Sequence, residues 1–346
     1  MTQPHLQIQK YPPYPSITLQ QSQVKEQSNN LNTDNMNRHY TYIAATLAFV
    51  MTIAWGCRSN KQKNNALEAT QDTPTVTYSN LLDKQTQEEV SKAMTHAGIA
   101  SENVASFLQN VKQFNDAIEG HGLVSSGFVK LDSILPHYDE VAIQTNWDEK
   151  HPEFAGYNCR ITSYDLLKDF IAVDQPADEH PTTLMFDEET LDNCGRTLFS
   201  SVERQAFRNL FAPVPTPNEK EIDKHLKNIQ DYWQRKGIRF IHKNDRAKAS
   251  LISVVMHSAI TPEESFLFVG HAGVLLPVSN QLLFVEKLTF QAPYQVIRFN
   301  NRSELNDYLM KMYDVEWGQP TASPFLMEND SLLEGYRPNP DKRAED

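Results

Sequence analysis

The spacing of hydrophobic residues predicts helices in the first half of the chain's body. One helix begins at Ser101 and ends near Gly120, and its apolar side chains share one face. These side chains are Val104, Phe107, Leu108, Val111, Phe114 and Ile118. Thr86 and Glu89 have the spacing of a capping box, which predicts an earlier helix. We expect the apolar stripe to pack in a core rather than to bind a ligand.

Three further helices are predicted from apolar spacing and from capping residues. One begins near Cys159, because four apolar side chains that follow it share a helical face: Ile161, Tyr164, Leu167 and Phe170. Asn218 with Glu221, and Asn301 with Glu304, have the spacing of capping pairs and predict the starts of two later helices. Cys159 is therefore expected at, or just before, a helix N-terminus.

Segments rich in β-branched and aromatic residues dominate the second half of the chain. They predict five strands, at residues 238–241, 250–257, 266–276, 281–290 and 294–299. Helices that are followed by a run of antiparallel strands are typical of the α+β class. We therefore expect N-terminal helices packed with a C-terminal antiparallel sheet.

The N-terminal region has the composition of a signal followed by a tether. A short basic start at Met36 precedes an apolar run of 15 residues, from Tyr42 to Gly56. This run is shorter than the roughly 20 residues that a membrane-spanning helix needs, and the pattern is typical of a secretory signal. We expect residues 1–35 to be an extension that is disordered or precedes the true start, 36–56 a signal and 57–75 a flexible tether. Residues 76–330 would form one α+β domain, followed by a disordered tail at 331–346.

The apolar run ends on Gly56-Cys57 and so resembles a bacterial lipoprotein signal. The resemblance implies that Cys57 carries lipid and becomes the first residue of the mature protein. It also implies an extracytoplasmic protein, held at a bacterial membrane through this lipid. The alternative is a short membrane anchor that is not cleaved.

Charge and cysteine content restrict the function classes. The whole chain has a formal net charge of −12, and because residues 1–56 carry +1, residues 57–346 carry −13. An acidic body argues against nucleic acid as a partner, since phosphate binding depends on Lys and Arg. Besides Cys57 the chain has Cys159 and Cys194, which could form one disulfide but no disulfide scaffold. Short Cys/His pair spacings are absent from the sequence, so we expect no metal and no cofactor.

Cys159 is the first candidate for catalysis. The positive end of a helix dipole lowers the pKa of a thiol at the N-terminus and favours the nucleophilic thiolate. Arg160 adds positive charge beside it. The alternative is a buried cysteine that packs as a small hydrophobic residue.

His271 and Glu286 are the second and third candidates. Gly270 and Gly273 flank the histidine, which predicts space above it for a backbone or a substrate. A tight hairpin centred between residues 278 and 279 would place His271 directly opposite Glu286, on one face. The carboxylate would then orient the imidazole and stabilise its cation. The alternative for His271 is a buried histidine in a structural hydrogen bond.

An oxyanion hole near Cys159 would need hydrogen-bond donors. The backbone N–H groups of Cys159 and Arg160 are candidates. Gln144, Asn146 and Asn158 could supply a side-chain donor, and Gln144 is favoured among them. The alternative is that these polar side chains are simply solvated.

The order Cys, His and then an acidic residue resembles that of the papain-like cysteine hydrolases, which include bacterial cell-wall amidases and endopeptidases. More closely, the chain resembles an uncharacterised family of bacterial lipoproteins that carry a domain of unknown function. This closer resemblance lies in five segments: Tyr78-Ser-Asn-Leu, Gly156-Tyr-Asn-Cys-Arg, Gly270-His-Ala-Gly-Val-Leu, Phe284-Val-Glu-Lys and Pro293-Tyr-Gln. The papain-like resemblance implies a papain-like architecture and a hydrolase of peptides or cell-wall material. The alternative function is a lipoprotein that binds a ligand or partner without catalysis.

Overall fold

The computed structural model describes residues 76–131, 136–174, 180–261, 264–315, 321–339 and 341–342. All of them belong to one compact unit of the chain. The predicted signal, the tether and Cys57 lie outside the described residues. Within the described ranges, no helix has the length and the apolar character needed to cross a membrane.

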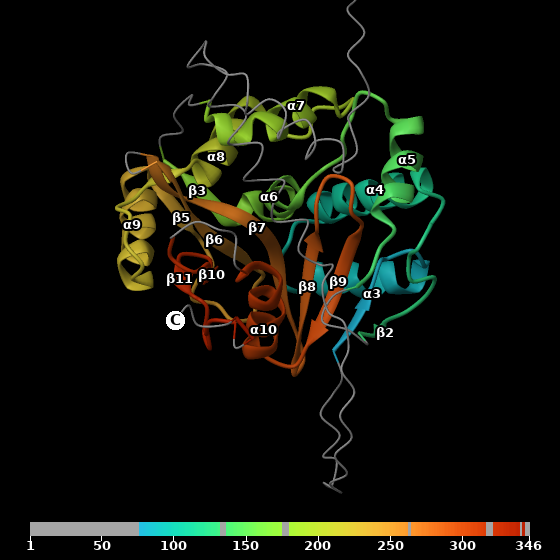
Figure 1. Cartoon of the computed structure of the whole chain (residues 1–346). Coiled ribbons are helices and arrows are strands. Elements are labelled where there is room, and N and C mark those ends of the chain that lie inside the picture. The colour runs from blue at the N-terminus through green and yellow to red at the C-terminus, as the bar shows by residue number, and fades with distance from the viewer. Residues whose placement is uncertain are drawn as a thin grey trace, which may run out of the picture. The chain divides into compact units, whose positions relative to one another are not determined.

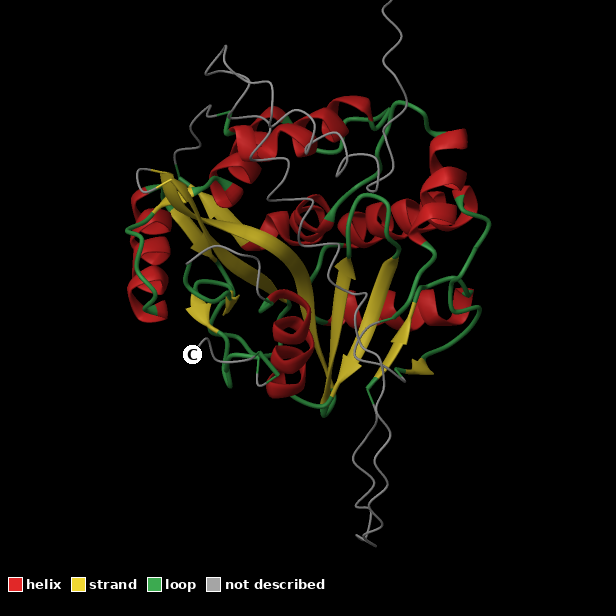
Figure 2. Cartoon of the chain, in the orientation of Figure 1, coloured by secondary structure: helices red, strands yellow, loops and turns green. Residues whose placement is uncertain are grey.

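An antiparallel sheet runs through the middle of the described structure (Figures 1 and 2). Its strands are β1 (Thr77–Ser79), β2 (Val129–Lys130), β4 (Val214–Pro215), β6 (Ser250–Thr261), β7 (Glu264–Val278), β8 (Gln281–Lys287), β9 (Tyr294–Phe299), β10 (Phe325–Glu328) and β11 (Ser331–Leu332). They are arranged in the order β11-β10-β6-β7-β8-β9-β1-β2, and β4 also pairs with β7. A separate pair consists of β3 (Ile171–Val173) and β5 (Ile238–Phe240). The mixed α+β class and the mainly antiparallel sheet agree with the prediction.

Helices cover both faces of this sheet. They are α3 (Lys84–His96), α4 (Ser101–Ala117), α5 (Glu140–Lys150), α6 (Cys159–Leu167), α7 (Met185–Asn193), α8 (Ser201–Phe211), α9 (Ile222–Arg235) and α10 (Arg302–Tyr313), with 3-10 turns at Lys168–Phe170 and Thr182–Leu184. Figure 1 shows α10 on the other side of the strands from α4 and α6. Two apolar clusters correspond to these two sides, one with side chains of α3, α4 and α6 and the other with those of α10. We call them the α6 face and the α10 face.

The helix caps confirm one predicted start and correct two. The side chain of Asn301 accepts a hydrogen bond from the Glu304 N–H and begins α10, as predicted. The cap of α3 is Asp83, whose carboxylate accepts the N–H of Thr86, so the predicted capping box is wrong. α9 begins after Glu221 without a side-chain cap, so that capping pair is also wrong.

The hairpin between β7 and β8 has a different register from the predicted one. Val278 pairs with Gln281, and Ser279 adopts a left-handed φ of 53° in the turn. Glu286 is therefore opposite Gly273 instead of His271, a shift of two residues. Because side chains alternate with a period of two, this shift still leaves His271 and Glu286 on the same face, the α10 face.

A β-bulge precedes His271 on β7. Val254 of β6 pairs with His271, but the next residue, Val255, pairs with Val269, which leaves Gly270 unpaired. An extra residue reverses the alternation of side chains. Val269 consequently faces α6, whereas His271 faces α10.

The two glycines beside His271 are required by packed neighbours. A backbone does approach one of them, Gly273, as predicted, but the predicted open space above His271 is not found. A Cβ atom on Gly270 would lie 2.4 Å from the sulfur of Met256. A Cβ atom on Gly273 would lie 2.3 Å from the ring of Phe284 and 3.0 Å from the carbonyl oxygen of Val285. Side chains and backbone therefore already occupy the space that the glycines leave.

The C-terminal segment is more ordered than the sequence suggested. Ser331 and Leu332 form β11, which pairs with β10. Leu333 is buried, and the hydroxyl of Tyr336 donates to the carbonyl oxygen of Pro324. The predicted disorder from residue 331 is therefore wrong through residue 339.

Candidate functional site

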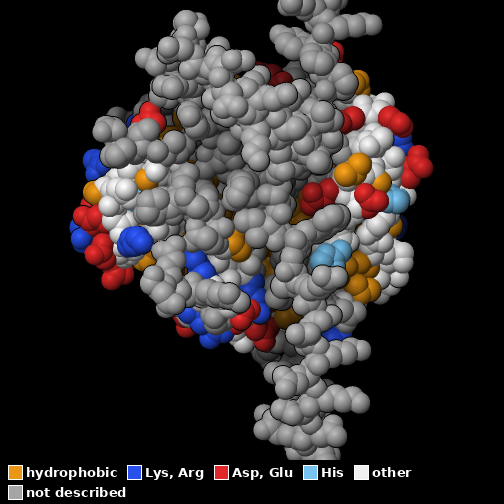
Figure 3. Space-filling model, in the orientation of Figure 1, with side chains coloured by type: hydrophobic (Ala, Val, Ile, Leu, Met, Phe, Trp, Pro, Cys, Tyr) orange, Lys and Arg blue, Asp and Glu red, His pale blue; other side chains and the backbone are white. Residues whose placement is uncertain are grey.

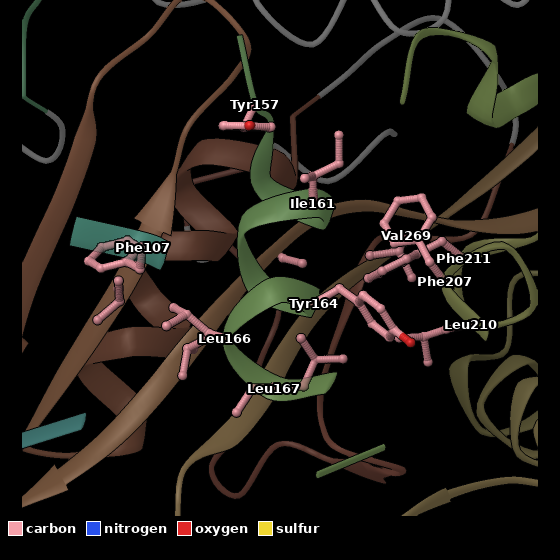
Figure 4. Close-up of a cluster of buried hydrophobic side chains, with 14 of the residues drawn as sticks. Phe107, Tyr157, Ile161, Tyr164, Leu166, Leu167, Phe207, Leu210, Phe211 and Val269 are labelled. Carbon is pink, nitrogen blue, oxygen red and sulfur yellow. The ribbon is translucent and has the colours of Figure 1, made fainter. Parts of the chain in front are cut away.

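Helix α6, which begins at Cys159, is surrounded by apolar side chains. Figure 4 shows the cluster, with side chains from α4, α8 and β7 packed around the helix: Phe107, Phe207, Leu210, Phe211 and Val269. On α6 itself, Ile161, Tyr164 and Leu166 are buried among them. Burial of one such side chain contributes roughly 1.5–3 kcal/mol. The position of Cys159 is thus fixed by the packing of a whole helix and not by a loop.

Polar contacts fix the first turn of α6. The side chain of Asn158 accepts the Ile161 N–H at 2.9 Å and donates to Asp187 of α7 at 2.8 Å. Arg160 binds the same carboxylate twice, at 3.0 Å and 2.6 Å, and donates to the carbonyl oxygen of Val269 at 3.2 Å. Both members of this ion pair are buried, and leaving one of them unpaired costs about 3–5 kcal/mol. The start of α6 is therefore attached to α7 and to β7.

The ladder between β7 and β8 extends from Val278–Gln281 to Gly273–Glu286. Before Gly273, β7 pairs with β6 and β4. The start of α6 packs against this part of β7, where a backbone hydrogen bond joins Ala272 to Cys159. The thiol on the α6 side can thus contact His271, whose imidazole binds Glu286 on the α10 side.

Cys159 and His271 form a hydrogen-bonded pair. The Nε2 atom of His271 lies 2.6 Å from a carboxylate oxygen of Glu286, which leaves Nδ1 for the thiol. Both described cysteines, Cys159 and Cys194, are free, so the disulfide between them is not formed. The structure therefore brings the three residues Cys159, His271 and Glu286 into one chain of contacts.

The two partners shift each other's pKa toward a thiolate–imidazolium pair. Burial raises the pKa of Cys159. The charge and the hydrogen bond of His271, together with Arg160 and the Ala272 backbone, lower this pKa by more than burial raises it, so the net shift is downward. Burial lowers the pKa of His271, but Cys159 and then Glu286 raise it, so the net shift is upward. An opposite charge in contact outweighs desolvation for both groups. Cys159 is therefore prepared as a nucleophile.

Glu286 is held by hydrogen bonds that suit its ionised form. One oxygen faces His271, and the other accepts from the Gln295 amide and the Tyr308 hydroxyl, each at 2.7 Å. The amide oxygen of Gln295 in turn accepts from Tyr138 at 2.8 Å. Every donor around Glu286 points toward it, so the carboxylate is satisfied as an anion despite complete burial.

Sequence reasoning missed four residues that support the site. Gln295 and Tyr308 hold Glu286, Tyr313 stacks on His271 with ring centroids 5.1 Å apart, and Asp187 holds the start of α6. In the helix that begins after Asn301, Tyr308 has the spacing of an apolar position. Its hydroxyl was a usable signal, because a buried Tyr O–H normally has a hydrogen-bond partner.

The structure does not bring Gln144 to Cys159. Gln144 lies on α5, where its amide donates to Asp148 of the same helix at 3.4 Å. Asn146 lies on α5 as well. Asn158 is adjacent to the thiol, but its oxygen is used to cap α6. The backbone N–H groups of Cys159 and Arg160 are still available as oxyanion donors, because the first N–H groups of a helix have no acceptor within it.

Other chemistry finds less support in the described structure. Across the described ranges, no group of three or more His, Cys, Asp and Glu side chains is arranged to hold a metal ion. Figure 3 shows both basic and acidic side chains on the described surface of one face.

No curated protein and no solved structure matches this chain. One family model does match it, over residues 77–333, and this range contains Cys159, His271 and Glu286. The model is described as a domain of unknown function, DUF4300. Because the match covers well over half of the chain, the protein belongs to the DUF4300 family.

Proposed function

We propose that this protein is a papain-like cysteine hydrolase that cleaves amides or esters. The observation that carries the proposal is the buried chain of contacts from Cys159 through His271 to Glu286. Nucleophile, base and orienting carboxylate in hydrogen-bond contact are the arrangement that acyl transfer requires. Its placement at the start of a helix that packs on an antiparallel sheet is the papain-like element of the proposal.

The reaction would proceed through a thioester. The Cys159 sulfur attacks the carbonyl carbon, and the oxygen becomes an oxyanion that backbone N–H groups at the start of α6 stabilise. The His271 imidazolium gives its proton to the leaving amine or alcohol as the carbon–heteroatom bond breaks. His271 then takes a proton from water, the hydroxide attacks the thioester, and release of the acid restores the thiolate–imidazolium pair. Glu286 stays ionised and balances the imidazolium charge.

We further propose that the hydrolase acts outside the cytoplasm, attached to a bacterial membrane by lipid on Cys57. Peptides or cell-wall peptide material would be its substrates. The sequence of residues 36–57 supports this location. If it is right, fatty-acid label enters the wild type and is lost in Cys57→Ser; label that persists in this variant refutes Cys57 as the acceptor.

A binding lipoprotein without catalysis is the second candidate. Cys159 is only 6 % exposed, which favours this alternative. In a hydrolase, neighbouring side chains must move before a substrate reaches the sulfur. Reactivity of the thiol therefore separates the two functions.

The test is alkylation of Cys159 by iodoacetamide at pH 6, followed by peptide mass spectrometry. Cys194 is a free thiol in the same chain and serves as an internal reference. We expect Cys159 to react much faster than Cys194 in the wild type, and His271→Ala to remove this difference. Equal, slow reaction of both thiols in the wild type would overturn the hydrolase and leave the binding protein.

A further inference from the structure

The direction of the Gln295 amide decides how many hydrogen bonds Glu286 receives. The amide nitrogen donates to Glu286 at 2.7 Å and to the Tyr308 hydroxyl at 2.8 Å. Because the Tyr308 oxygen accepts this bond, its own hydrogen is left for Glu286, at 2.7 Å. An amide turned by 180° would face Glu286 with its oxygen and draw the Tyr308 hydrogen away from it. The carboxylate would then lose both donors.

Tyr138 holds the other end of the Gln295 amide. Its hydroxyl donates to the amide oxygen of Gln295 at 2.8 Å. Burial raises the pKa of Tyr138, so the hydroxyl keeps its hydrogen. A hydroxyl can also accept a hydrogen bond. Tyr138 therefore fixes the amide only if its own hydrogen is directed toward Gln295.

Asn80, which directly follows β1, has a direction that the backbone fixes. Its amide oxygen accepts the backbone N–H of Val124 at 3.0 Å, and its amide nitrogen donates to the backbone carbonyl oxygen of Tyr294 at 2.9 Å. A backbone N–H can only donate and a backbone carbonyl can only accept. The oxygen and the nitrogen of the Asn80 amide therefore cannot exchange places without loss of both bonds.

Asn80 in turn directs the hydrogen of Tyr138. The amide nitrogen of Asn80 donates to the Tyr138 oxygen at 2.8 Å, so the hydrogen of Tyr138 is directed away from Asn80 and toward the Gln295 oxygen. Each group in this chain donates to the next, and the last one donates to Glu286. Asn80 and Gln295 are fully buried, so protein groups and not bulk water satisfy their amides.

We infer that Tyr138 and Asn80 are positioning residues, which set the direction of the Gln295 amide and thereby keep its donors on Glu286. This inference rests on the proposed function, because the charge of Glu286 matters only through the ion pair that it supports. Neither residue exchanges a proton in the reaction. The reactivity of the site then depends on the connection between α4 and α5, which contains Tyr138.

The rate of Cys159 alkylation by iodoacetamide at neutral pH tests this inference. In Tyr138→Phe the amide of Gln295 is no longer held from its oxygen side. Glu286 then loses donors that favour its charged form, and less of Cys159 is held as a thiolate. We expect alkylation to be roughly fivefold slower than in the wild type.

A control and a second background show whether the effect passes through Gln295. Tyr336→Phe is the matched control, because this partly buried tyrosine also donates one hydrogen bond, to the carbonyl oxygen of Pro324 at 3.0 Å. It should leave the rate unchanged. In a Gln295→Met background, Tyr138→Phe should have no further effect, since no amide is left to direct. The same factor in both backgrounds would show a general effect on the fold and overturn the inference.

The outcomes separate the inference from the function. Fast alkylation of Cys159 in the wild type that is unchanged in Tyr138→Phe overturns the role of Tyr138 and leaves the hydrolase. If Cys159 reacts no faster than Cys194 in the wild type, both are overturned.

Gln295→Glu tests the same direction where Tyr138→Phe fails to fold. The variant keeps the shape of the side chain and an acceptor for Tyr138, but it has no N–H to face Glu286. Two adjacent carboxyl groups resist ionising together, so one takes a proton. Because the Tyr138 hydrogen stabilises charge on the new carboxylate, the proton goes to Glu286 and His271 loses its counter-ion. We expect roughly tenfold slower alkylation, and an unchanged rate overturns the inference.

Discussion

Two buried histidines on neighbouring strands of the sheet, His257 on β6 and His271 on β7, have opposite electrostatic properties. Each is 1 % exposed. The pKa of His257 is lowered to about 4, by burial and by the charge of His225. The pKa of His271 is raised, because Cys159 and Glu286 outweigh its burial. Equal burial of the same side chain therefore gives a neutral ring in one place and a cation in the other.

The partners explain the difference. His257 accepts the Ala322 N–H at Nδ1, so Nε2 carries the proton and donates to the Ser265 hydroxyl at 2.8 Å. Both contacts suit the neutral ring. His271 has an acid at each end, the thiol and the carboxylate, and both stabilise a protonated ring once they are ionised. Burial lowers the pKa of both rings, and the partners that the fold supplies decide whether this effect is outweighed.

The largest expected effect on the reactivity of Cys159 is that of removing the His271 ring, with removal of the His257 ring as the comparison. His271→Ala should raise the pKa of Cys159 and slow its alkylation at pH 6 by roughly 100-fold, because little thiolate remains. His257→Asn should change this rate by less than twofold. Rate constants for the two variants, measured side by side, check the contrast. Equal rates would show that His271 is as structural as His257.

Acid stability should depend on His257. Its pKa is about 4 in the folded protein and about 6.5 in the unfolded chain. Between these two pKa values, the His257 ring is therefore protonated in the unfolded chain and neutral in the native protein. The stabilisation is present in full above pH 6.5 and is lost as the pH falls toward 4. Between pH 6.5 and 4.5 this loss amounts to about 2 kcal/mol.

Urea unfolding of the wild type and of His257→Asn at these two pH values measures this loss. Between the two pH values, the free energy of unfolding should change by about 2 kcal/mol less in the variant than in the wild type, whatever the absolute stability of the variant. The same pH dependence in both proteins would contradict a neutral His257.

Glu286→Gln sharpens the contrast from the carboxylate side. The variant keeps the shape of the residue but removes its charge and turns an amide NH2 group toward one of the surrounding donors, so the pKa of His271 should fall. Less of Cys159 is then held as a thiolate by the imidazolium, and we expect roughly tenfold slower alkylation at neutral pH. A pH–rate profile of alkylation measures this change. If the rate at neutral pH is unchanged, the charge of Glu286 is not what keeps His271 protonated.

The smallest expected effect is that of Tyr308→Phe. It removes one hydrogen bond to Glu286, which still accepts from Gln295. A hydrogen bond to a charged group contributes about 1.5–3 kcal/mol, but most of this would appear as lost stability. We expect the alkylation rate at neutral pH to fall less than in Glu286→Gln. A larger fall would place the control of His271 in α10.

Periodicity predicted the parts of the fold that depend on one element at a time. Cys159 begins a helix because the apolar positions after it have helical spacing, and the strands from residue 238 onward follow from local composition. The shared face of His271 and Glu286 was reached through a register that is wrong by two residues. The predicted face is still correct, because side chains alternate with a period of two and a register error of two residues does not change the face.

Features that join distant segments could not be read from the sequence. The bulge at Gly270 depends on which residues of β6 lie opposite β7. The contacts of Asp187 with Arg160 and of Gln295 with Glu286 join different helices or strands, and no local pattern encodes them. Gln144 illustrates the reverse error, because a polar residue near the nucleophile in sequence lies on another helix and bonds within it.

The bulge at Gly270 makes the ladder between β6 and β7 irregular, but it also places Val269 and His271 on opposite faces of the sheet. The ladder between β6 and β7 would be regular without it, and a regular ladder favours a stable sheet. Without Gly270, however, Val269 and His271 would lie on the same face of the sheet. Either Val269 would then leave the α6 face, or His271 would lose its contact with Glu286. An insertion or deletion of one residue here would therefore separate the packing of Val269 from the contact between His271 and Glu286, whereas a change of two residues would keep both side chains on their faces.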